Sequence, residues 1–403
     1  MPETAARTEA LIELENRYGA HNYHPLDVVC TEGQGVWLTD VDGRRYMDFL
    51  AAYSAVNQGH NHPRIAEALI RQAKRLALTS RAFRNDRFPP LLEKLCRLTG
   101  FDKALLMNSG AEAVETALKA MRKWAYDVKG VPYAEAEIVV AEGNFHGRTT
   151  TIVGFSTDPD STSRFGPFTP GFRIVPYGDL EAVKAAVGPK TAAIFVEPIQ
   201  GEGGVIIPPD GYLKGLREIA DRNGILLVLD EIQSGLGRTG RLFAFEHEGI
   251  RPDAVTIGKA LSGGFYPVSA FLASNAVMDV FTPGIHGSTY GGNPLACAVA
   301  SEALDVLVEE KLVERAAELG VHLEARLRTM KTDKVEAVRV RGLWAGVQLK
   351  LSAGPARPYC YRLKERGMLC KDTHAQTIRL APPLVITREE IDWAVDQLEA
   401  VLA

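Results

Sequence analysis

A series of short apolar runs, each closed by turn residues, occupies the middle of this sequence. The runs are AEIVVA, FRIVPY, TAAIFVEP, GILLVLDE, DAVTIGK and VSAFLAS, between residues 136 and 274, and helical stretches separate most of them. A strand made only of apolar residues has no polar face, so other elements must cover it on both sides. The pattern therefore predicts an α/β fold with a mostly parallel sheet between layers of helices.

The sequences on either side of this region have a different character. GVWLTDVDGRRYMDFL, residues 35–50, predicts a β-hairpin whose turn contains Asp42 and Gly43. Residues 301–327 predict one long amphipathic helix, with an apolar stripe made of Leu304, Val308, Leu312, Ala316, Leu319 and Leu323. Strands are expected within residues 338–351 and 377–386, and helices over 358–367 and 388–402.

These patterns divide the chain into three expected parts. They are an N-terminal segment with the hairpin over residues 1–52, a large α/β domain over residues 53–300, and a smaller α+β domain over residues 301–403. The last part, of about a hundred residues, has an ordinary domain size. Because a two-stranded hairpin is only marginally stable in water, we expect the N-terminal hairpin to pack against the small domain.

Charge and cysteine content exclude several classes of protein. The formal net charge is −4 over 403 residues, without a block of five or six like charges, which argues against nucleic acid or an anionic membrane as the main partner. No apolar run approaches the roughly 18 residues of a membrane-spanning helix. The N-terminus is acidic and lacks the apolar core of a secretion signal. The five cysteines show no Cys-x-x-Cys spacing, so we expect a cytoplasmic protein with reduced thiols.

Reactive side chains follow three of the predicted strands. Asp230 ends the run ILLVLD, Glu197 ends AAIFVE, and Lys259 follows AVTIG. In open α/β sheets, ligands bind outside the carboxyl ends of the strands, so Asp230 and Lys259 are expected to face one crevice. Taken alone, Lys259 is more typical of a solvated loop than of a nucleophile, and Asp230 is as typical of a helix N-cap or a turn as of a catalytic residue.

The pairing of an amine with a carboxylate is more informative than either group. An amine beside a sheet edge is desolvated, which lowers its pKa and allows it to attack a carbonyl. A carboxylate is the partner that the pyridinium nitrogen of pyridoxal phosphate requires, and these two groups are the protein's main contribution to that cofactor's chemistry. We therefore interpret Lys259 and Asp230 as catalytic residues that act with pyridoxal phosphate.

A candidate phosphate site precedes the helix predicted over residues 111–125. Asn108, Ser109, Gly110 and Ala111 lead into that helix, and free backbone N–H groups at a helix start suit an anion. The same residues also fit an ordinary capping box, with Ser109 as N-cap and Glu112 at the third helical position. The sequence leaves both interpretations open.

Two further motifs resemble binding sites only superficially. GLGRTG, residues 235–240, fits the dinucleotide pattern G-x-G-x-x-G, but the preceding strand ends at Asp230, and Lys259 stands where an acidic residue is required. His60 and His62 have the spacing of metal ligands, but a loop before a helix that starts with proline explains them better. We therefore expect neither a dinucleotide nor a metal ion.

Over nearly its whole length the sequence resembles the class III, fold-type I, pyridoxal phosphate-dependent aminotransferases. The motifs that carry the resemblance are GAHNYHPL, YSAVNQGHNHP, LTSRAF, NSGAEAVETALK, GNFHGRT, VEPIQGEGG, DEIQSGLGRTG, GKALSGGFYPVSA, GSTYGGNPL and IRLAPPLVI. The resemblance implies a seven-stranded sheet in the large domain, and a homodimer or higher homo-oligomer with active sites at the subunit interface. GAHNYHPL and YSAVNQGH are most similar to those members that transfer the δ-amino group of L-ornithine to 2-oxoglutarate.

The resemblance also assigns residues to the cofactor. It implies that Lys259 holds pyridoxal 5′-phosphate covalently and moves a proton between substrate and cofactor, and that Asp230 pairs with the ring nitrogen. Gln233 would bond the ring's phenolic oxygen, and Phe145 and Ile232 would lie on the two faces of the ring. The phosphate contacts would be Ser109, Gly110 and Ala111, with Ser288 and Thr289 from the neighbouring subunit.

For the substrates, the resemblance implies a set of tyrosines and charged residues. Tyr23 and Arg148 would hold the α-amino acid end of ornithine, and Tyr53 would line the pocket. Arg379 and Arg148 would bind the two carboxylates of 2-oxoglutarate, because a bidentate arginine suits a carboxylate. Glu202 would pair with Arg379 while ornithine is bound, which prevents ornithine's α-carboxylate from binding in the wrong orientation.

Two alternatives remain open at the level of the sequence. The first is a related aminotransferase for N-acetylornithine, 4-aminobutyrate or another ω-amino acid, because only the substrate residues would differ. The second is a non-catalytic binding or regulatory protein of the same fold, against which the set of Lys259, Asp230, Arg148 and Arg379 argues. His146 stands where ornithine-specific members can have tryptophan, whereas other members of the family also have histidine.

Overall fold

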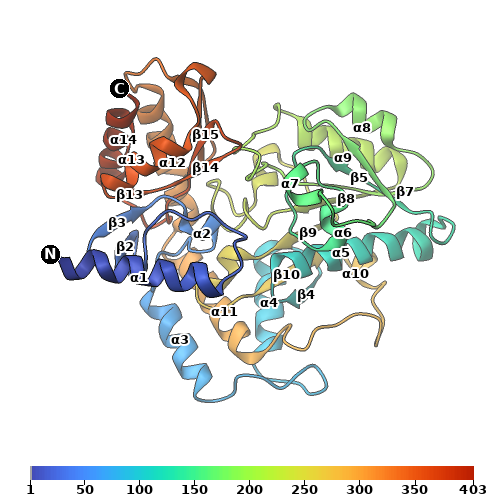
Figure 1. The fold of residues 1–403 in the computed structure, drawn as a ribbon. Coiled ribbons are helices and arrows are strands. Elements are labelled where there is room, and N and C mark those ends of the chain that lie inside the picture. Colours follow the sequence, from blue (N-terminus) through green and yellow to red (C-terminus); the bar gives the residue numbers. More distant parts are fainter. Residues whose placement is uncertain (1) are drawn as a thin grey trace.

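A computed structural model describes the backbone of residues 2–403 and the side chains from residue 7 onward (Figure 1). Its central element is a seven-stranded sheet with the strand order β4-β10-β9-β8-β7-β5-β6. The strands are β4 Lys103–Met107, β5 Glu137–Ala141, β6 Phe172–Val175, β7 Thr191–Val196, β8 Leu226–Asp230, β9 Ala254–Ile257 and β10 Ser269–Ala273.

Most neighbouring strands of this sheet run parallel. β10 is antiparallel to β4 and β9, whereas the pairs β9–β8, β8–β7, β7–β5 and β5–β6 are parallel. The six strands predicted from the apolar runs and the seven-stranded, mostly parallel sheet are confirmed. The strand β4 was missed, because its short run KALLM starts with an exposed lysine and carries no clear periodicity.

Helices cover both faces of the central sheet, and further helices belong to the N- and C-terminal parts of the chain (Figure 1). They are α1 Pro2–Tyr18, α2 Ala51–Ser54, α3 Pro63–Ala73, α4 Phe88–Thr99, α5 Gly110–Trp124, α6 Thr150–Val153, α7 Pro159–Thr162, α8 Leu180–Ala186, α9 Tyr212–Asn223, α10 Asn275–Met278, α11 Pro294–Glu309, α12 Leu312–Arg328, α13 Arg357–Glu365 and α14 Arg388–Leu402. Adjacent strand residues enter different apolar clusters. Ile138 belongs to the cluster that contains α5, and Val139 to the cluster that contains α9.

Two four-stranded sheets flank the central one. The first consists of β1 Cys30–Gln34, β2 Trp37–Asp40, β3 Arg45–Asp48 and β13 Met368–Leu369, and the second of β11 Val335–Val340, β12 Ala345–Leu349, β15 Thr377–Leu380 and β14 Lys371–Thr373. The predicted hairpin is confirmed, because β2 and β3 pair antiparallel. β13 adds to β3 in parallel, with Met368 opposite Met47, so the N-terminal strands share a sheet with the C-terminal part of the chain.

The prediction of one long helix over residues 301–327 is wrong. The chain forms α11 and α12 instead, and Lys311, between them, has a left-handed conformation with φ of 53°. Val308, expected on the buried stripe, is half exposed, whereas Leu304 and Leu312 are buried. The break allows α11 to pack against α3 and α4, while α12 turns to pack against α14 and β11.

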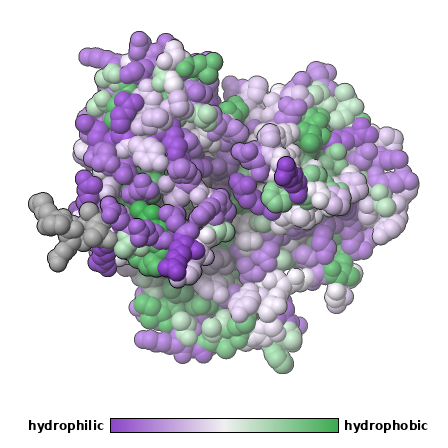
Figure 2. Space-filling model, in the orientation of Figure 1, coloured by the Kyte–Doolittle hydropathy of each residue, from purple (hydrophilic) through white to green (hydrophobic). Residues whose placement is uncertain are grey.

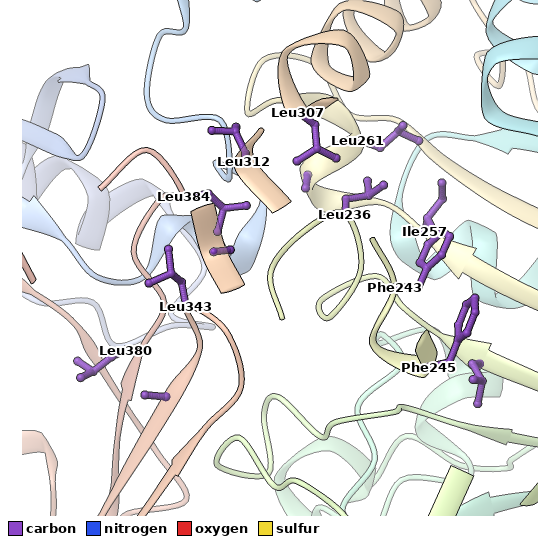
Figure 3. Close-up of a cluster of buried hydrophobic side chains, with 14 of the residues drawn as sticks. Leu236, Phe243, Phe245, Ile257, Leu261, Leu307, Leu312, Leu343, Leu380 and Leu384 are labelled. Carbon is purple, nitrogen blue, oxygen red and sulfur yellow. The ribbon is translucent and has the colours of Figure 1, made fainter. Parts of the chain in front are cut away.

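One apolar core joins the central sheet to the smaller sheets. Figure 3 shows this cluster, which continues from Leu380 and Leu343 through Leu307 to Ile257 and Phe243. Continuous packing of this kind fixes the C-terminal strands relative to the carboxyl edge of the central sheet. Among residues 2–403, no helix combines the length and apolar character needed to cross a membrane.

Candidate active site

Lys259 lies just beyond the carboxyl end of β9. It begins the 3₁₀-helix η3, Lys259–Ser262, in a left-handed conformation with φ of 42°. Gly263 and Gly264 follow with φ of 56° and 81°, and a Cβ on Gly263 would lie 2.6 Å from Ile65. Because residues with a side chain rarely adopt such angles, the two glycines allow the sharp bend behind the lysine.

Two acidic side chains stand on the neighbouring strands. Asp230 is the last residue of β8, and Glu197 directly follows β7. Since β7, β8 and β9 are parallel neighbours, Lys259 and these carboxylates share one edge of the sheet. A cavity of about 200 Å³ opens there, lined by Gly110, Ala111, Phe145, His146, Gly147, Glu197, Ile199, Asp230, Ile232, Gln233 and Lys259.

Both carboxylate oxygens of Asp230 are engaged. Oδ2 lies 2.7 Å from Nδ1 of His146, and Oδ1 accepts hydrogen bonds from the Thr256 hydroxyl at 2.9 Å and from the Ile232 N–H at 3.0 Å. His146 is buried and stacks on Phe195, with ring centroids 4.3 Å apart. The contact between His146 and Asp230 was not predicted from the sequence. The only indication was that histidine occupies a position where some family members have tryptophan, because no local pattern shows that residues 146 and 230 are in contact.

Burial changes the ionisation of two groups in the cavity. Burial and the neighbouring Asp230 carboxylate raise the pKa of Glu197 to about 7, against the opposing effect of His146. Burial also lowers the pKa of the Lys259 amine to about 8, and the Arg379 guanidinium adds to this decrease against nearby carboxylates. The lysine therefore has a neutral, nucleophilic form close to physiological pH.

The start of α5 borders the same cavity. Ser109 is its N-cap: the Ser109 hydroxyl accepts from the Glu112 N–H at 3.2 Å, and Glu112 Oε2 accepts from the Ser109 N–H at 2.7 Å. The capping box is thus confirmed, and Ser109 itself is exposed and outside the cavity lining. Gly110 and Ala111 do line the cavity, and N–H groups in the first turn of a helix have no acceptor within it. The capping box is therefore compatible with an anion site at the same helix start.

The groups around the cavity fit pyridoxal 5′-phosphate. This cofactor needs an amine for its aldehyde, a carboxylate for its ring nitrogen and an anion site for its phosphate, and Lys259, Asp230 and the start of α5 meet these needs. An added Cβ on Gly110 would lie 3.1 Å from Ile232, so a larger residue would crowd the space beside the ring. No group of three or more potential metal ligands occurs in the part of the chain that the structure describes.

Arg379, on β15, extends the site beyond the cofactor cavity. Its side chain is almost fully buried, Nη1 donates to Glu202 Oε1 at 2.9 Å, and Nη2 donates to Gln233 Oε1 at 2.8 Å. Because Gln233 also lines the cavity, its bond to Arg379 connects the Arg379–Glu202 ion pair to the cavity lining. Burial acts to raise the pKa of Glu202, but Arg379, Lys371 and Lys259 outweigh burial and lower it.

Tyr53 lies beside these cations on a left-handed turn. Its ring centroid is 5.4 Å from the guanidinium carbon of Arg379 and 6.0 Å from Lys259 Nζ. The residues of α2 have φ of 46°, 46°, 59° and 76°, and each such L-residue costs roughly 1 kcal/mol or more. Asp48 Oδ1 accepts two backbone N–H groups at the start of this turn, at 2.7 and 3.0 Å. Backbone strain of this kind is concentrated at functional sites.

None of the five substrate residues expected from the sequence lines the cavity beside Lys259, and this includes Tyr23 and Arg148. Tyr23 is 72% exposed and lines, with Tyr53, a second cavity of about 400 Å³. Arg148 is exposed, donates to the Ser161 hydroxyl at 3.2 Å, and lies 5.5 Å from the ring centroid of Phe145. The structure therefore brings Arg379, Glu202 and Tyr53 together, places Tyr23 in a second cavity that Tyr53 also lines, and places Arg148 beside Ser161 and Phe145.

Ser288 and Thr289 are also outside this cavity. The Ser288 hydroxyl accepts from Asn108 Nδ2 at 2.9 Å, and Thr289 is exposed. Within one chain, Ser288 therefore borders the residue that precedes the α5 cap, and Thr289 faces outward.

The two rejected motifs have structural roles. His60 pairs with Asp48 at 2.8 Å and His62 pairs with Glu310 at 3.0 Å, so each imidazole contacts a different carboxylate. In GLGRTG, Arg238 is buried and donates to two backbone carbonyls of the C-terminal part, at 2.8 and 2.6 Å. This segment therefore joins the central sheet to the C-terminal part.

Comparison with known proteins identifies the family of this chain. A model of the family "Aminotransferase class-III" matches residues 18–402. The ornithine aminotransferase of Bordetella pertussis is 60% identical over 403 residues, which cover 100% of this chain and 97% of that protein. The solved ornithine aminotransferase from Toxoplasma gondii has a TM-score of 0.96 at 46% identity, covering 98% of this chain and 94% of that chain. An acetylornithine aminotransferase from Elizabethkingia anophelis has a TM-score of 0.89 at 48% identity, with 98% of both chains covered. The chain therefore belongs to the class-III aminotransferases.

Proposed function

We propose that this chain transfers the δ-amino group of L-ornithine to 2-oxoglutarate, the activity of an ornithine aminotransferase. The products are glutamate and glutamate 5-semialdehyde, which cyclises to pyrroline-5-carboxylate. The observation that carries the substrate assignment is the 2.9 Å ion pair between Glu202 and the buried Arg379, close to Lys259. Full-length similarity to ornithine aminotransferases, at 60% and 54% identity in two relatives, supports the same assignment.

At the cofactor end, each residue has a distinct task. Pyridoxal 5′-phosphate, when bound, draws electrons from the substrate carbon that carries the amine, which makes the proton on that carbon acidic. Asp230, fixed by His146 and Thr256, would be the partner of the ring nitrogen. The Lys259 Nζ would accept the proton from the δ-carbon of ornithine and serve as its carrier. Gln233 uses Oε1 for Arg379, which leaves its NH₂ group to donate to the phenolic oxygen.

Contacts to the ring faces and to the phosphate complete this proposal. Phe145 and Ile232 line the cavity and would bound the two faces of the ring, and the N–H groups of Gly110 and Ala111 would hold the phosphate. Ser109 would contribute by holding the start of α5 in place, because its own side chain is engaged in the capping box.

At the substrate end, one pocket must accept two substrates in turn. With ornithine, Glu202 neutralises Arg379, while Tyr23 and Arg148 hold the α-amino acid end and Tyr53 forms the wall. With 2-oxoglutarate, Arg379 binds the carboxylate next to the keto group, and Arg148 binds the other carboxylate. The ion pair thereby rejects the wrong orientation of ornithine by leaving no free cation for its carboxylate.

A second candidate is transamination of N-acetylornithine. The 48% identity to the acetylornithine aminotransferase from Elizabethkingia anophelis supports it, because that protein is similar over the full length of the chain. A free α-amino group needs a polar partner such as Tyr23, whereas an acetylated one does not. The two candidates therefore differ at the outer part of the site and share the cofactor end.

The experiment that separates the candidates is a product assay. Purified protein receives 2-oxoglutarate and, in parallel, L-ornithine, N-acetylornithine or 4-aminobutyrate. Pyrroline-5-carboxylate is trapped with o-aminobenzaldehyde, and glutamate is measured in every reaction. We expect trapped product with ornithine and little glutamate from the other donors. Glutamate formed mainly from N-acetylornithine or 4-aminobutyrate would overturn the ornithine assignment and leave the family unchanged.

We also infer a homodimer in which Ser288 and Thr289 reach the phosphate site of the partner subunit. Thr289 is exposed and outside the cavity of its own chain, which supports this inference. Figure 2 shows apolar surface gathered around α3, where Ile70 and Leu76 are exposed, and such patches mark interaction surfaces. Light scattering on the purified protein should give the mass of a dimer, and an active monomer would contradict the inference.

Two further expectations remain proposals. The division into residues 1–52, 53–300 and 301–403 is supported by the central sheet, which lies within the second part, although β13 of the third part joins the N-terminal sheet and α11 crosses the second boundary. A cytoplasmic location is supported by the cysteines, all five of which are free thiols.

A further inference from the structure

A second cation stands beside the Glu202–Arg379 ion pair. Lys371, on β14, lies directly opposite Arg379 of β15 in an antiparallel pairing. Directly opposed residues of such a pair have their side chains on the same face of the sheet, with Cβ atoms about 5 Å apart. Lys371 Nζ is 3.9 Å from Glu202 Oε2, whereas Arg379 bonds Oε1. Each oxygen of the carboxylate therefore faces a different cation.

The position of Glu202 is tied to the strand that carries Lys371. The backbone carbonyl of Glu202 accepts a hydrogen bond of 2.6 Å from the hydroxyl of Thr373, which is also on β14. Glu202 and Lys371 therefore keep their relative position when the Arg379 side chain moves. Like charges directly opposite each other on paired strands repel, so the two cations also need the carboxylate between them.

Both cations also face the same aromatic ring. Lys371 Nζ and the guanidinium carbon of Arg379 lie 5.3 and 5.4 Å from the ring centroid of Tyr53. The Lys371 side chain is 40% exposed, whereas that of Arg379 is 1% exposed. The lysine can therefore adjust its flexible ammonium group toward Glu202, while the arginine reaches the inner part of the site.

We propose that Lys371 is the alternative counter-ion of Glu202, which holds this carboxylate while Arg379 binds the carboxylate of 2-oxoglutarate. The inference rests on the proposed function, because it adds a third residue to the exchange between the two substrates. Without Lys371, release of Arg379 would leave Glu202 largely buried and unpaired, and an uncompensated buried charge is strongly unfavourable. Lys371 is thus a positioning residue that acts through Glu202 and makes the second substrate easier to accept.

The test compares Lys371→Met with Lys371→Arg and with Lys350→Met. Lys350 is an exposed lysine next to β12 without an ion pair among the described residues, so it serves as a matched control. In Lys371→Met, KM for 2-oxoglutarate should rise about five- to tenfold, while KM for ornithine stays within about twofold. The dissociation constant of glutarate, a dicarboxylate without the keto group, should rise by the same factor in calorimetric titrations of the holoenzyme. Lys371→Arg should restore wild-type values.

A double-mutant cycle shows whether Lys371 acts through Glu202. In the Glu202→Ala background, Lys371→Met should cause no further change in glutarate affinity, because the carboxylate to be held is absent. The proposal is wrong if glutarate affinity is unchanged in Lys371→Met, if KM rises equally for both substrates, or if the full effect persists without Glu202. A failure of the proposed function would be seen in the product assay instead, where the wild-type protein would form no pyrroline-5-carboxylate from ornithine.

Discussion

The cofactor end and the substrate end of this site rest on different kinds of support. Asp230 ends β8 and Lys259 lies just beyond β9, and both strands are buried along their whole length and paired in parallel. The substrate end is assembled from separate segments: β15 with Arg379, the loop after β7 with Glu202, and the left-handed turn of Tyr53. Paired parallel strands thus position the cofactor residues, whereas contacts between distant segments position the substrate residues.

This difference suits a reaction in which two substrates use one cofactor in turn. The chemistry at the cofactor is the same for both, so its residues gain from fixed geometry. The substrates differ in charge at the position of Arg379, so the pairing of this residue has to change. An ion pair between two segments can open without disturbing the paired strands. Changes at the cofactor end should therefore affect all substrates, and changes at the substrate end should alter the choice among them.

The largest effect is expected from Lys259→Ala. Loss of the amine removes both the covalent attachment of the cofactor and the proton carrier, so activity with every amino donor should fall on the order of 10⁴- to 10⁶-fold. Absorption spectra of the purified protein should lose the band of the covalently held cofactor. Lys350→Ala serves as the control. An absorption band that is unchanged in Lys259→Ala would favour a different anchoring residue and would contradict the assignment of the cofactor end to Lys259.

Asp230→Asn should have the next largest effect. The amide keeps the size of the side chain but removes the charge that stabilises a protonated ring nitrogen, so kcat should fall on the order of 10²- to 10³-fold. The decrease should be similar for ornithine and for glutamate in the reverse direction, as measured by steady-state kinetics. His146→Gln, which keeps the charge of Asp230 and changes only its neighbour, should have a smaller effect. A decrease confined to one substrate would show that Asp230 acts on binding instead.

Local signals explain why the cofactor end could be predicted from the sequence. An apolar run followed by Asp230 or Lys259 is visible within a few residues, and parallel strands bring their carboxyl ends together whatever the intervening loops do. The pairing of His146 with Asp230 has no such signal, because it depends on how two loops meet. The long helix was predicted without its break, since the left-handed Lys311 follows from packing on both sides and not from local propensity.

At the substrate end, residues could be predicted only through the family resemblance. Arg379 and Glu202 meet as that resemblance implied, whereas Tyr23 lines a second cavity with Tyr53 and Arg148 lies beside Phe145. Lys371 was not predicted from the sequence, because its position opposite Arg379 depends on the register of two short strands. Tertiary contacts between distant segments, which no local pattern encodes, therefore decide this part of the site.

Glu202→Ala should alter the choice of amino group. Without the carboxylate, Arg379 is free to bind ornithine's α-carboxylate, which turns the α-amino group toward the cofactor. The ratio of δ- to α-transamination should fall about 10- to 100-fold, the value of a hydrogen bond to a charged group. Trapped pyrroline-5-carboxylate and the α-keto product, measured in the same reaction, give this ratio. An unchanged ratio would show that the ion pair does not control the orientation of ornithine.

The pKa of Lys259 predicts how pH affects cofactor capture. Because the pKa is lowered to about 8, the rate of cofactor binding to apoprotein should rise about tenfold between pH 7 and pH 9 and then level off. The folded apoprotein also binds fewer protons at this lysine than the unfolded chain between pH 8 and 10.5. Its contribution to the free energy of unfolding should therefore increase with pH in that window. A midpoint near 10.5 in stopped-flow measurements would contradict the lowered pKa.

The smallest effect is expected from Tyr23→Ile, at the outermost part of the substrate end. Tyr23 is 72% exposed, so the loss of one hydrogen bond to ornithine should raise KM for ornithine about three- to tenfold. KM for 2-oxoglutarate should stay the same, because this substrate has no α-amino group to hold. Tyr23→Phe separates the hydroxyl from the ring and should reproduce most of the increase. An equal rise for both substrates would assign Tyr23 to the general shape of the pocket, and no rise at all would leave the discrimination between ornithine and N-acetylornithine to Arg148 and Tyr53.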